Sequence, residues 1–239
     1  MPSARSPRGA RSSGRGLGRG RSTLGSRGIE SYFSYINSLS PIAWYRFNTG
    51  ITITGQGASS WANWSGAGGA FLQATDGARP VQQGNGSLLC NGTDEFMSAT
   101  FTLVQPYTVY GLVNAVTWTS TDRIISSSTT FLSQVIGTPQ LALNAGTPLS
   151  SISPVLNTVN VIAIVGNSTS SVLQLNNGAP VTGDAGTGAF SNPFLGSSIA
   201  STLFGNIDNY EWMFFPTAHS ADVRAQIIRY LATVGSLSI

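Results

Sequence analysis

The sequence has no lysine, one cysteine and one histidine, and only 9% of its 239 residues are charged. With one thiol, Cys90, no disulfide can form within the chain, and with one imidazole, His219, no histidine pair can hold a transition metal. Zinc sites and disulfide scaffolds are therefore excluded. No apolar run approaches the roughly 20 residues of a membrane span, and the N-terminus lacks the apolar stretch of a signal peptide. We expect neither membrane insertion nor Sec-type secretion.

Positive charge is concentrated at the N-terminus. Residues 1–28 hold seven of the twelve arginines and no acidic residue, so this segment carries +7 and residues 29–239 carry −4. The segment is rich in Gly and Ser and has almost no large apolar side chain, so it cannot offset the entropy of ordering. We predict a basic tail that is disordered or bound to a partner. Its arginines are Arg5, Arg8, Arg11, Arg15, Arg19, Arg21 and Arg27.

Residues 29–40 form a lead-in segment between the tail and the first strand-like run. Large apolar side chains recur there at a helix-like spacing and stop before Pro41, which indicates a short helix. These apolar side chains could pack either against a neighbouring subunit or back onto the domain of the same chain. These side chains are Tyr32, Phe33, Tyr35, Ile36 and Leu39.

Residues 41–239 have the pattern of an all-β domain. Short runs rich in Val, Ile, Thr and aromatic residues alternate with Gly, Asn, Ser and Pro clusters. The clearest pair is a hairpin of 158–165 and 171–181, with a second turn at Asn177 and Gly178. This sequence pattern is typical of a β-sandwich or β-barrel.

Two elements are expected near the C-terminus. In the strand over 207–215, Tyr210, Trp212 and Phe214 alternate onto one face, which should enter the core, while Asn209, Glu211 and Met213 share the other face. After this strand, Ser220 is positioned to cap a helix that ends before Gly235. The apolar stripe of that helix comprises Val223, Ile227, Leu231 and Val234.

Four segments stand in a characteristic order along the body. They are SPIAWYRFNTG (40–50) with the following turn WANWSGAGG (61–69), LLCNGTDEFM (88–97), LQLNNGAPV (173–181) and LFGNIDNYEWMFFPTAHSADVRAQIIRYL (203–231). Together they resemble laminin-G-like, concanavalin-A-like jelly rolls, a family common in secreted proteins and in virion proteins of tailed phages. The resemblance implies an antiparallel jelly-roll sandwich over 41–239.

The family includes lectins, glycosidases, adhesion modules and virion proteins, so function must come from sites. A glycosidase on this scaffold needs two or three carboxylates on one strand, one to protonate the leaving oxygen and another to attack or activate water. The nearest acidic pair, Asp94 and Glu95, is adjacent in sequence at a turn, where Asp has a structural role. His219 lies just before a helix cap, and Cys90 lies in a strand-like run. We therefore expect that the chain is not an enzyme.

Some relatives bind calcium, because Asp and Asn oxygens in loops suit a hard cation. The candidates in this chain are scattered and never form a D-x-D-x-D run, so capping of single turns is favoured. We expect no cofactor. The candidates are Asp76, Asp94, Asp122, Asp184 and Asp208.

A sugar site would use an exposed aromatic ring together with polar hydrogen-bonding groups. Trp64 stands where the family usually has a polar residue, which indicates an aromatic side chain on a turn surface. Subunit packing is an equal alternative for Trp64, since aromatic residues are also enriched in interfaces. Tyr32 and Phe33 are the other interface candidates.

The arginine tail has two fitting partners, because the guanidinium fork suits phosphate and carboxylate. One is packaged nucleic acid, and the other is an acidic groove on a neighbouring shell protein. We expect a phage virion protein, either a capsid decoration (cement) protein or an appendage (head fibre) component, anchored by this arm. A carbohydrate-binding host-adhesion module and a genome-binding coat protein are the alternatives. A trimer is favoured by the symmetry of such shells.

Overall fold

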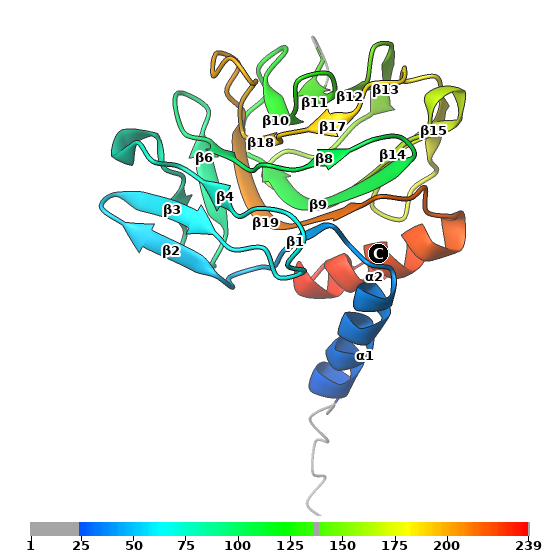
Figure 1. Ribbon diagram of the computed structural model, residues 1–239, viewed down its shortest axis with the longest axis horizontal. Helices are drawn as coiled ribbons and strands as arrows, with labels where there is room; N and C mark the ends of the chain where they lie inside the picture. Colours follow the sequence, from blue (N-terminus) through cyan, green and yellow to red (C-terminus); the bar gives the residue numbers. More distant parts are fainter. Residues whose placement is uncertain (1–23, 136–138, 239) are drawn as a thin grey trace, which may run out of the picture.

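The computed structural model describes residues 24–135 and 139–238, and its body is a sandwich of two antiparallel sheets (Figure 1). This confirms the all-β sandwich with a C-terminal helix that the sequence predicts. The arginines of the tail up to Arg21 lie outside the described residues, whereas Arg27 lies within the first helix.

The first sheet has eight strands. They are β1 (Ala43–Tyr45), β5 (Val81–Gln82), β6 (Leu88–Asn91), β9 (Tyr107–Ala115), β14 (Val159–Gly166), β15 (Ser171–Leu175), β16 (Val181–Gly183) and β19 (Asn206–Phe215). Their order is β16-β15-β14-β9-β19-β6-β5, and β1 pairs with β19. The hairpin of β14 and β15 is the one that the sequence predicts, joined by the short 3-10 helix η2 (Ser168–Ser170).

The second sheet has nine strands. They are β2 (Ile51–Thr54), β3 (Gly57–Trp61), β4 (Phe71–Leu72), β7 (Met97–Ser98), β10 (Arg123–Ser126), β11 (Phe131–Gln134), β12 (Leu141–Asn144), β13 (Pro148–Ile152) and β18 (Phe194–Leu195). Their order is β13-β12-β11-β10-β18-β7-β4-β3-β2. A separate pair is formed by β8 (Thr102–Leu103) and β17 (Phe190–Ser191), and the 3-10 helix η1 (Asp76–Ala78) follows β4.

Strand β19 buries both of its faces. A register shift between Asn209 and Glu211 places a β-bulge at Tyr210, and a bulge changes the face on which a side chain lies. Trp212 and Phe214 enter the core between the sheets, as predicted, but Tyr210 joins the opposite cluster. The prediction of one shared face was therefore wrong at Tyr210. Cys90, on the neighbouring strand β6, is also buried, and burial raises the pKa of its thiol.

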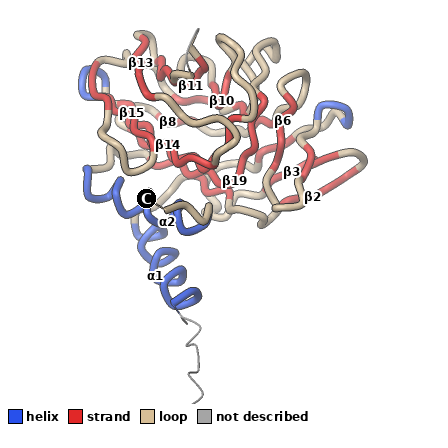
Figure 2. The backbone as a smooth tube through the Cα atoms, turned by 180° about the vertical axis from the view of Figure 1, so that it is seen from behind, coloured by secondary structure: helices blue, strands red, loops and turns tan. Residues whose placement is uncertain are grey.

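Two helices cover the outer face of the first sheet. Figure 2 shows α1 (Leu24–Ser38) and α2 (Ala221–Val234) together on this side, with α1 projecting from the body. The Ser220 hydroxyl accepts a hydrogen bond from the Val223 N–H at 3.4 Å, which caps α2 as predicted. Ile227 and Leu231 are fully buried in a second apolar cluster between α2 and the sheet.

The lead-in segment folds back onto its own domain. Helix α1 begins at Leu24, before the compositional change near Gly28. Ile36 is completely buried, the Phe33 ring lies 5.6 Å from the Trp44 ring, and the Tyr32 ring lies 5.7 Å from the Tyr230 ring. Of the two packings that the sequence leaves open, the chain adopts the intramolecular one. This packing gives no support to a trimer, which stays a prediction. In the part of the chain that the structure describes, no helix is long and apolar enough to span a membrane.

Candidate functional site

A cavity of about 270 Å³ opens where α1 and α2 meet the edge of the first sheet. Its walls come from α1, from the residues that follow β1, from β19 and from the last turns of α2. Four of the lining side chains are wholly apolar, and the other four carry a polar or charged group. The lining residues are Ile29, Phe33, Arg46, Phe47, Glu211, Tyr230, Thr233 and Val234.

Glu211 is the buried acid of this cavity, with 1% of its surface exposed. Its Oε1 accepts hydrogen bonds from the Trp44 Nε1–H at 2.6 Å and from the Tyr230 hydroxyl at 2.8 Å. Its Oε2 accepts one from the Phe47 backbone N–H at 3.1 Å. These bonds tie β1, β19 and α2 together: Trp44 and Phe47 belong to β1 and to the segment after it, Tyr230 belongs to α2, and Glu211 belongs to β19.

Burial raises the pKa of the Glu211 carboxyl above its ordinary value of 4.5. The three hydrogen bonds and the charge of Arg46 favour the ionised form and oppose this rise. Burial also raises the pKa of Tyr230, and the neighbouring Glu211 carboxylate adds to the effect, so Tyr230 stays a hydrogen-bond donor.

The raised pKa of Glu211 predicts a specific pH dependence of stability. Between the ordinary pKa of a glutamate and the raised pKa of Glu211 in the folded chain, the folded chain holds a proton that the unfolded chain has lost. The free energy of unfolding therefore falls as pH rises across this interval. Glu211→Gln removes this titration. We expect the unaltered protein to lose stability relative to Glu211→Gln as pH rises across that interval. Urea denaturation of both proteins at a series of pH values measures the difference, and a difference that does not vary with pH would contradict the assignment.

Arg46 is held between aromatic rings beside this acid. Its guanidinium carbon lies 4.0 Å from the centre of the Phe33 ring, 4.5 Å from that of Trp64 and 5.5 Å from that of Trp44. Cation–π contacts of this kind stabilise the positive charge of the guanidinium. Among the described residues, no carboxylate oxygen lies within 4.0 Å of an Arg46 nitrogen.

Trp64 lies in the loop after β3 and is 53% exposed. The loop is fixed to β1 from two directions: the Trp64 N–H donates to the Trp44 carbonyl at 2.7 Å, and the Asn63 side-chain carbonyl accepts from the Trp44 N–H at 2.8 Å. The Asn63 amide also donates to the Gly68 carbonyl at 2.7 Å, which closes the turn. Asn63 thus holds the turn, and Trp64 presents its ring beside Arg46.

Glu211 and Arg46 were missed as site residues. The alternation of the strand over 207–215 places Glu211 on the face opposite Trp212 and indicates no role for it. The signal that could have found it is a single carboxylate within the apolar run of 210–215, because an isolated buried acid needs partners. Arg46 has no such signal, since its aromatic neighbours come from α1 and from the loop after β3.

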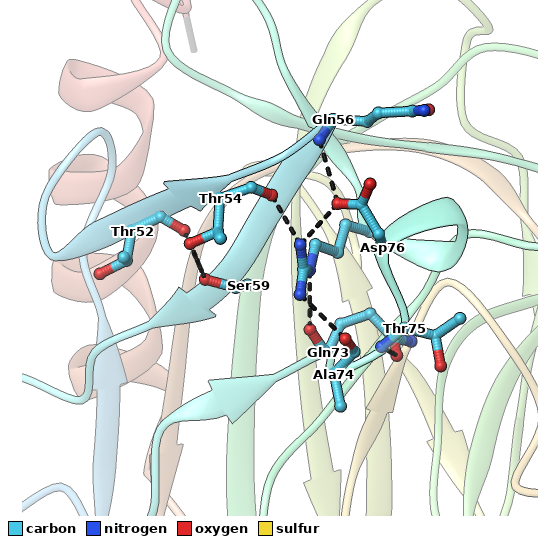
Figure 3. A network of polar contacts seen from close by, with 9 residues as sticks. Thr52, Thr54, Gln56, Ser59, Gln73, Ala74, Thr75 and Asp76 are labelled. Atoms are coloured by element: carbon cyan, nitrogen blue, oxygen red, sulfur yellow. Dashed lines mark hydrogen bonds and ion pairs between the residues drawn. The ribbon is translucent and has the colours of Figure 1, made fainter.

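A second polar cluster, around Arg79, holds the loop after β4 (Figure 3). The Arg79 guanidinium donates to the carbonyls of Thr54, Gln73 and Ala74 at 2.7, 3.0 and 2.8 Å, and to Asp76 at 2.5 Å. Arg79 thereby ties the β2–β3 hairpin to the segment before η1. With four of its five N–H donors used within the chain, Arg79 has a structural role.

Four of the five calcium candidates accept hydrogen bonds from protein groups. Asp76 accepts from Arg79, Asp94 from Asn91, Asp184 from the Gly186 N–H, and Asp208 from Ser87 and Asn114. The fifth candidate, Asp122, lies between the strands β9 and β10 and belongs to no group of acidic residues in the described part of the chain. Within residues 24–135 and 139–238 there is no group of three or more His, Cys, Asp or Glu that could hold a metal ion.

His219 is buried beside aromatic rings. Its Nδ1 lies 2.9 Å from the Tyr110 hydroxyl, and its ring lies 4.5 Å from that of Phe215. Burial, together with the nearby Arg224 charge, lowers the pKa of His219 to about 4. The imidazole is therefore neutral at physiological pH and packs α2 against the sheet.

No family model and no curated protein matches the chain. Solved structures match in fold. Trypanosoma rangeli sialidase in complex with the inhibitor DANA matches with a TM-score of 0.59 and 10% identity, over 84% of this chain and 37% of the sialidase chain. A GH54 α-L-arabinofuranosidase soaked with a cyclic sulfate inhibitor matches with a TM-score of 0.55 and 12% identity, over 74% of this chain and 51% of that chain.

These matches correct one expectation. The prediction that the chain is not an enzyme is contradicted, because the matched chains are a sialidase and an arabinofuranosidase. At 10% and 12% identity, and over 37% and 51% of those chains, the likeness shows the fold alone. The laminin-G-like resemblance is accordingly supported as a jelly-roll-like β-sandwich.

Proposed function

We propose that this protein is a structural component of a tailed-phage virion, displayed on the capsid or on an appendage and attached by its basic N-terminal arm. The observation that carries the proposal is the division of charge, +7 over residues 1–28 against −4 over residues 29–239. The arginine-rich arm can bind a polyanion of any sequence, whereas the body is mildly acidic. This division suits a protein that is tethered through its arm.

The placement of α1 supports a tether of this kind. The last turns of α1 pack on the sandwich through Ile36 and Phe33, while its first turns point away from both sheets (Figure 1). The arm therefore continues from the end of α1 that is farther from the body. Its arginines suit the acidic groove of a shell protein, and packaged nucleic acid is the alternative partner. A trimer on a local three-fold axis remains part of the proposal.

Immunoelectron microscopy of intact particles tests the proposal. An antibody raised against residues 29–239 should label the outside of purified particles, since the body is displayed. Particles that stay unlabelled both intact and after opening would contradict a virion role. Labelling only after opening would favour the genome-binding alternative over display.

A second function, glycan binding in host adhesion, is favoured by the exposed ring of Trp64 and by the adjoining cavity of Arg46 and Glu211. Aromatic rings beside a few convergent polar groups are the usual elements of a sugar site. This function is compatible with display on a particle and can be tested separately from it.

A further inference from the structure

We infer that the cavity between α1, α2 and β19 is a binding site for a single neutral hexopyranose. The inference rests on the glycan-binding function proposed above and not on attachment to particles. The volume of the cavity, about 270 Å³, lies just below the range of about 300–1,000 Å³ that is typical of pockets for drug-sized ligands. The cavity therefore suits one sugar ring and not an oligosaccharide.

The charges of the cavity select a neutral ligand. Arg46 and Glu211 both line it, yet no oxygen of Glu211 lies within 4.0 Å of an Arg46 nitrogen. A bound anion would meet the Glu211 carboxylate, and a bound cation would meet the Arg46 guanidinium. A hydroxyl group suits both partners, because it donates to a carboxylate and accepts from a guanidinium.

Both charged groups have hydrogen-bonding capacity left. A carboxylate has about four acceptor positions, and the protein donors Trp44, Tyr230 and Phe47 use two on Oε1 and one on Oε2. The remaining position belongs to Oε2. The Arg46 guanidinium makes no ion pair with a carboxylate of the described residues, so it keeps N–H donors for a ligand hydroxyl.

The apolar half of the lining suits the C–H face of a pyranose. Phe33 and Phe47 supply rings, and Val234 completes this wall. Trp64 does not line the cavity but contacts Arg46 on its outer side. Trp64 is therefore a positioning residue that holds the guanidinium, and not the platform on which the sugar stacks.

Saturation-transfer NMR with the full chain and four probes, D-glucose, D-galactose, D-mannose and N-acetyl-D-glucosamine, tests the site. Two variants block it: Arg46→Ala removes the donor, and Thr233→Trp fills the mouth from an exposed position of α2. Gln226→Trp is the matched control, because Gln226 is exposed on the same helix and lies outside the cavity lining. We expect transfer to at least one probe, weakened at least about tenfold in affinity by each blocking variant and unchanged in the control.

The outcomes separate the site from the wider function. Transfer that persists in both blocking variants would show that the sugar does not bind in this cavity. Glycan binding would then have to take place elsewhere on the body. No transfer to any probe would overturn both. If Arg46→Ala fails to fold, the transfer measured with Thr233→Trp alone tests whether the sugar binds in the cavity. Trp64→Phe, which keeps a ring beside Arg46, should bind as the unaltered protein does, whereas Trp64→Ala should bind more weakly.

Discussion

Replacing Trp212 by alanine is expected to lower the free energy of unfolding by about 3 to 5 kcal/mol. Trp212 is fully buried between the sheets, and its Nε1–H donates to the Asn209 side-chain carbonyl at 3.1 Å. Its ring covers the backbone of Gly111 on β9 so closely that a Cβ there would lie 2.6 Å from it. The smaller side chain leaves a cavity and an unpaired buried carbonyl, and both are destabilising.

Two other tryptophans serve as a matched comparison. Trp61 is also fully buried and donates to the Arg46 carbonyl at 3.0 Å, so Trp61→Ala should cost about 3 to 5 kcal/mol as well. Trp64→Ala should cost less than about 1 kcal/mol, because that ring is 53% exposed. Urea denaturation of the three variants measures these values. A Trp64→Ala variant as unstable as the other two would place its ring in the core and remove it from the contact surface.

Deletion of residues 1–23 is expected to abolish attachment to particles while leaving the body folded. This deletion removes six arginines and spares α1, which begins at Leu24 and packs on the domain. Cosedimentation with particles that lack the protein measures attachment, and circular dichroism checks the fold. In the full chain, attachment should weaken with added salt, and this salt dependence should decrease as arginines are replaced stepwise by alanine. Attachment that survives the deletion would rule out the arm as the anchor.

Binding to nucleic acid distinguishes the two partners of the arm. If the arm binds the genome, the isolated protein should bind any duplex, and the logarithm of its affinity should fall with log salt by about 0.9 for each phosphate contact. If the arm binds a protein groove, attachment to particles should exceed binding to duplex at the same salt. Replacement of the arginines by lysine retains the charge and removes the planar fork, so it should preserve genome binding better than groove binding.

The β-sandwich could be predicted because its signals are local. Alternating apolar runs joined by a short polar turn mark the hairpin of β14 and β15, the Asn177-Gly178 turn follows β15, and a capping serine marks α2. The bulge at Tyr210 has no such signal, since an extra residue in one strand depends on how its partners β6 and β9 pair with it. The face of Tyr210 was therefore predicted wrongly while its neighbours Trp212 and Phe214 were placed correctly.

The candidate site could be predicted only in part. The exposed turn position of Trp64 follows from a departure from the family motif. The pairing of Arg46 with Phe33 and of Glu211 with Tyr230 depends on the docking of two helices on one sheet face, which no short stretch of sequence encodes. The lead-in segment shows the same limit, because its aromatic spacing suits a subunit interface as well as the intramolecular packing that it makes with Trp44.

Mass spectrometry of purified particles from the source measures whether the protein is part of the virion. We expect the protein in intact particles at a fixed copy number relative to the major shell protein: many copies for a decoration protein, a handful for an appendage. We also expect a chain lacking residues 1–23 to be absent from those particles. Particles that contain none of the full-length protein, in a source that produces it, would contradict a role in the virion.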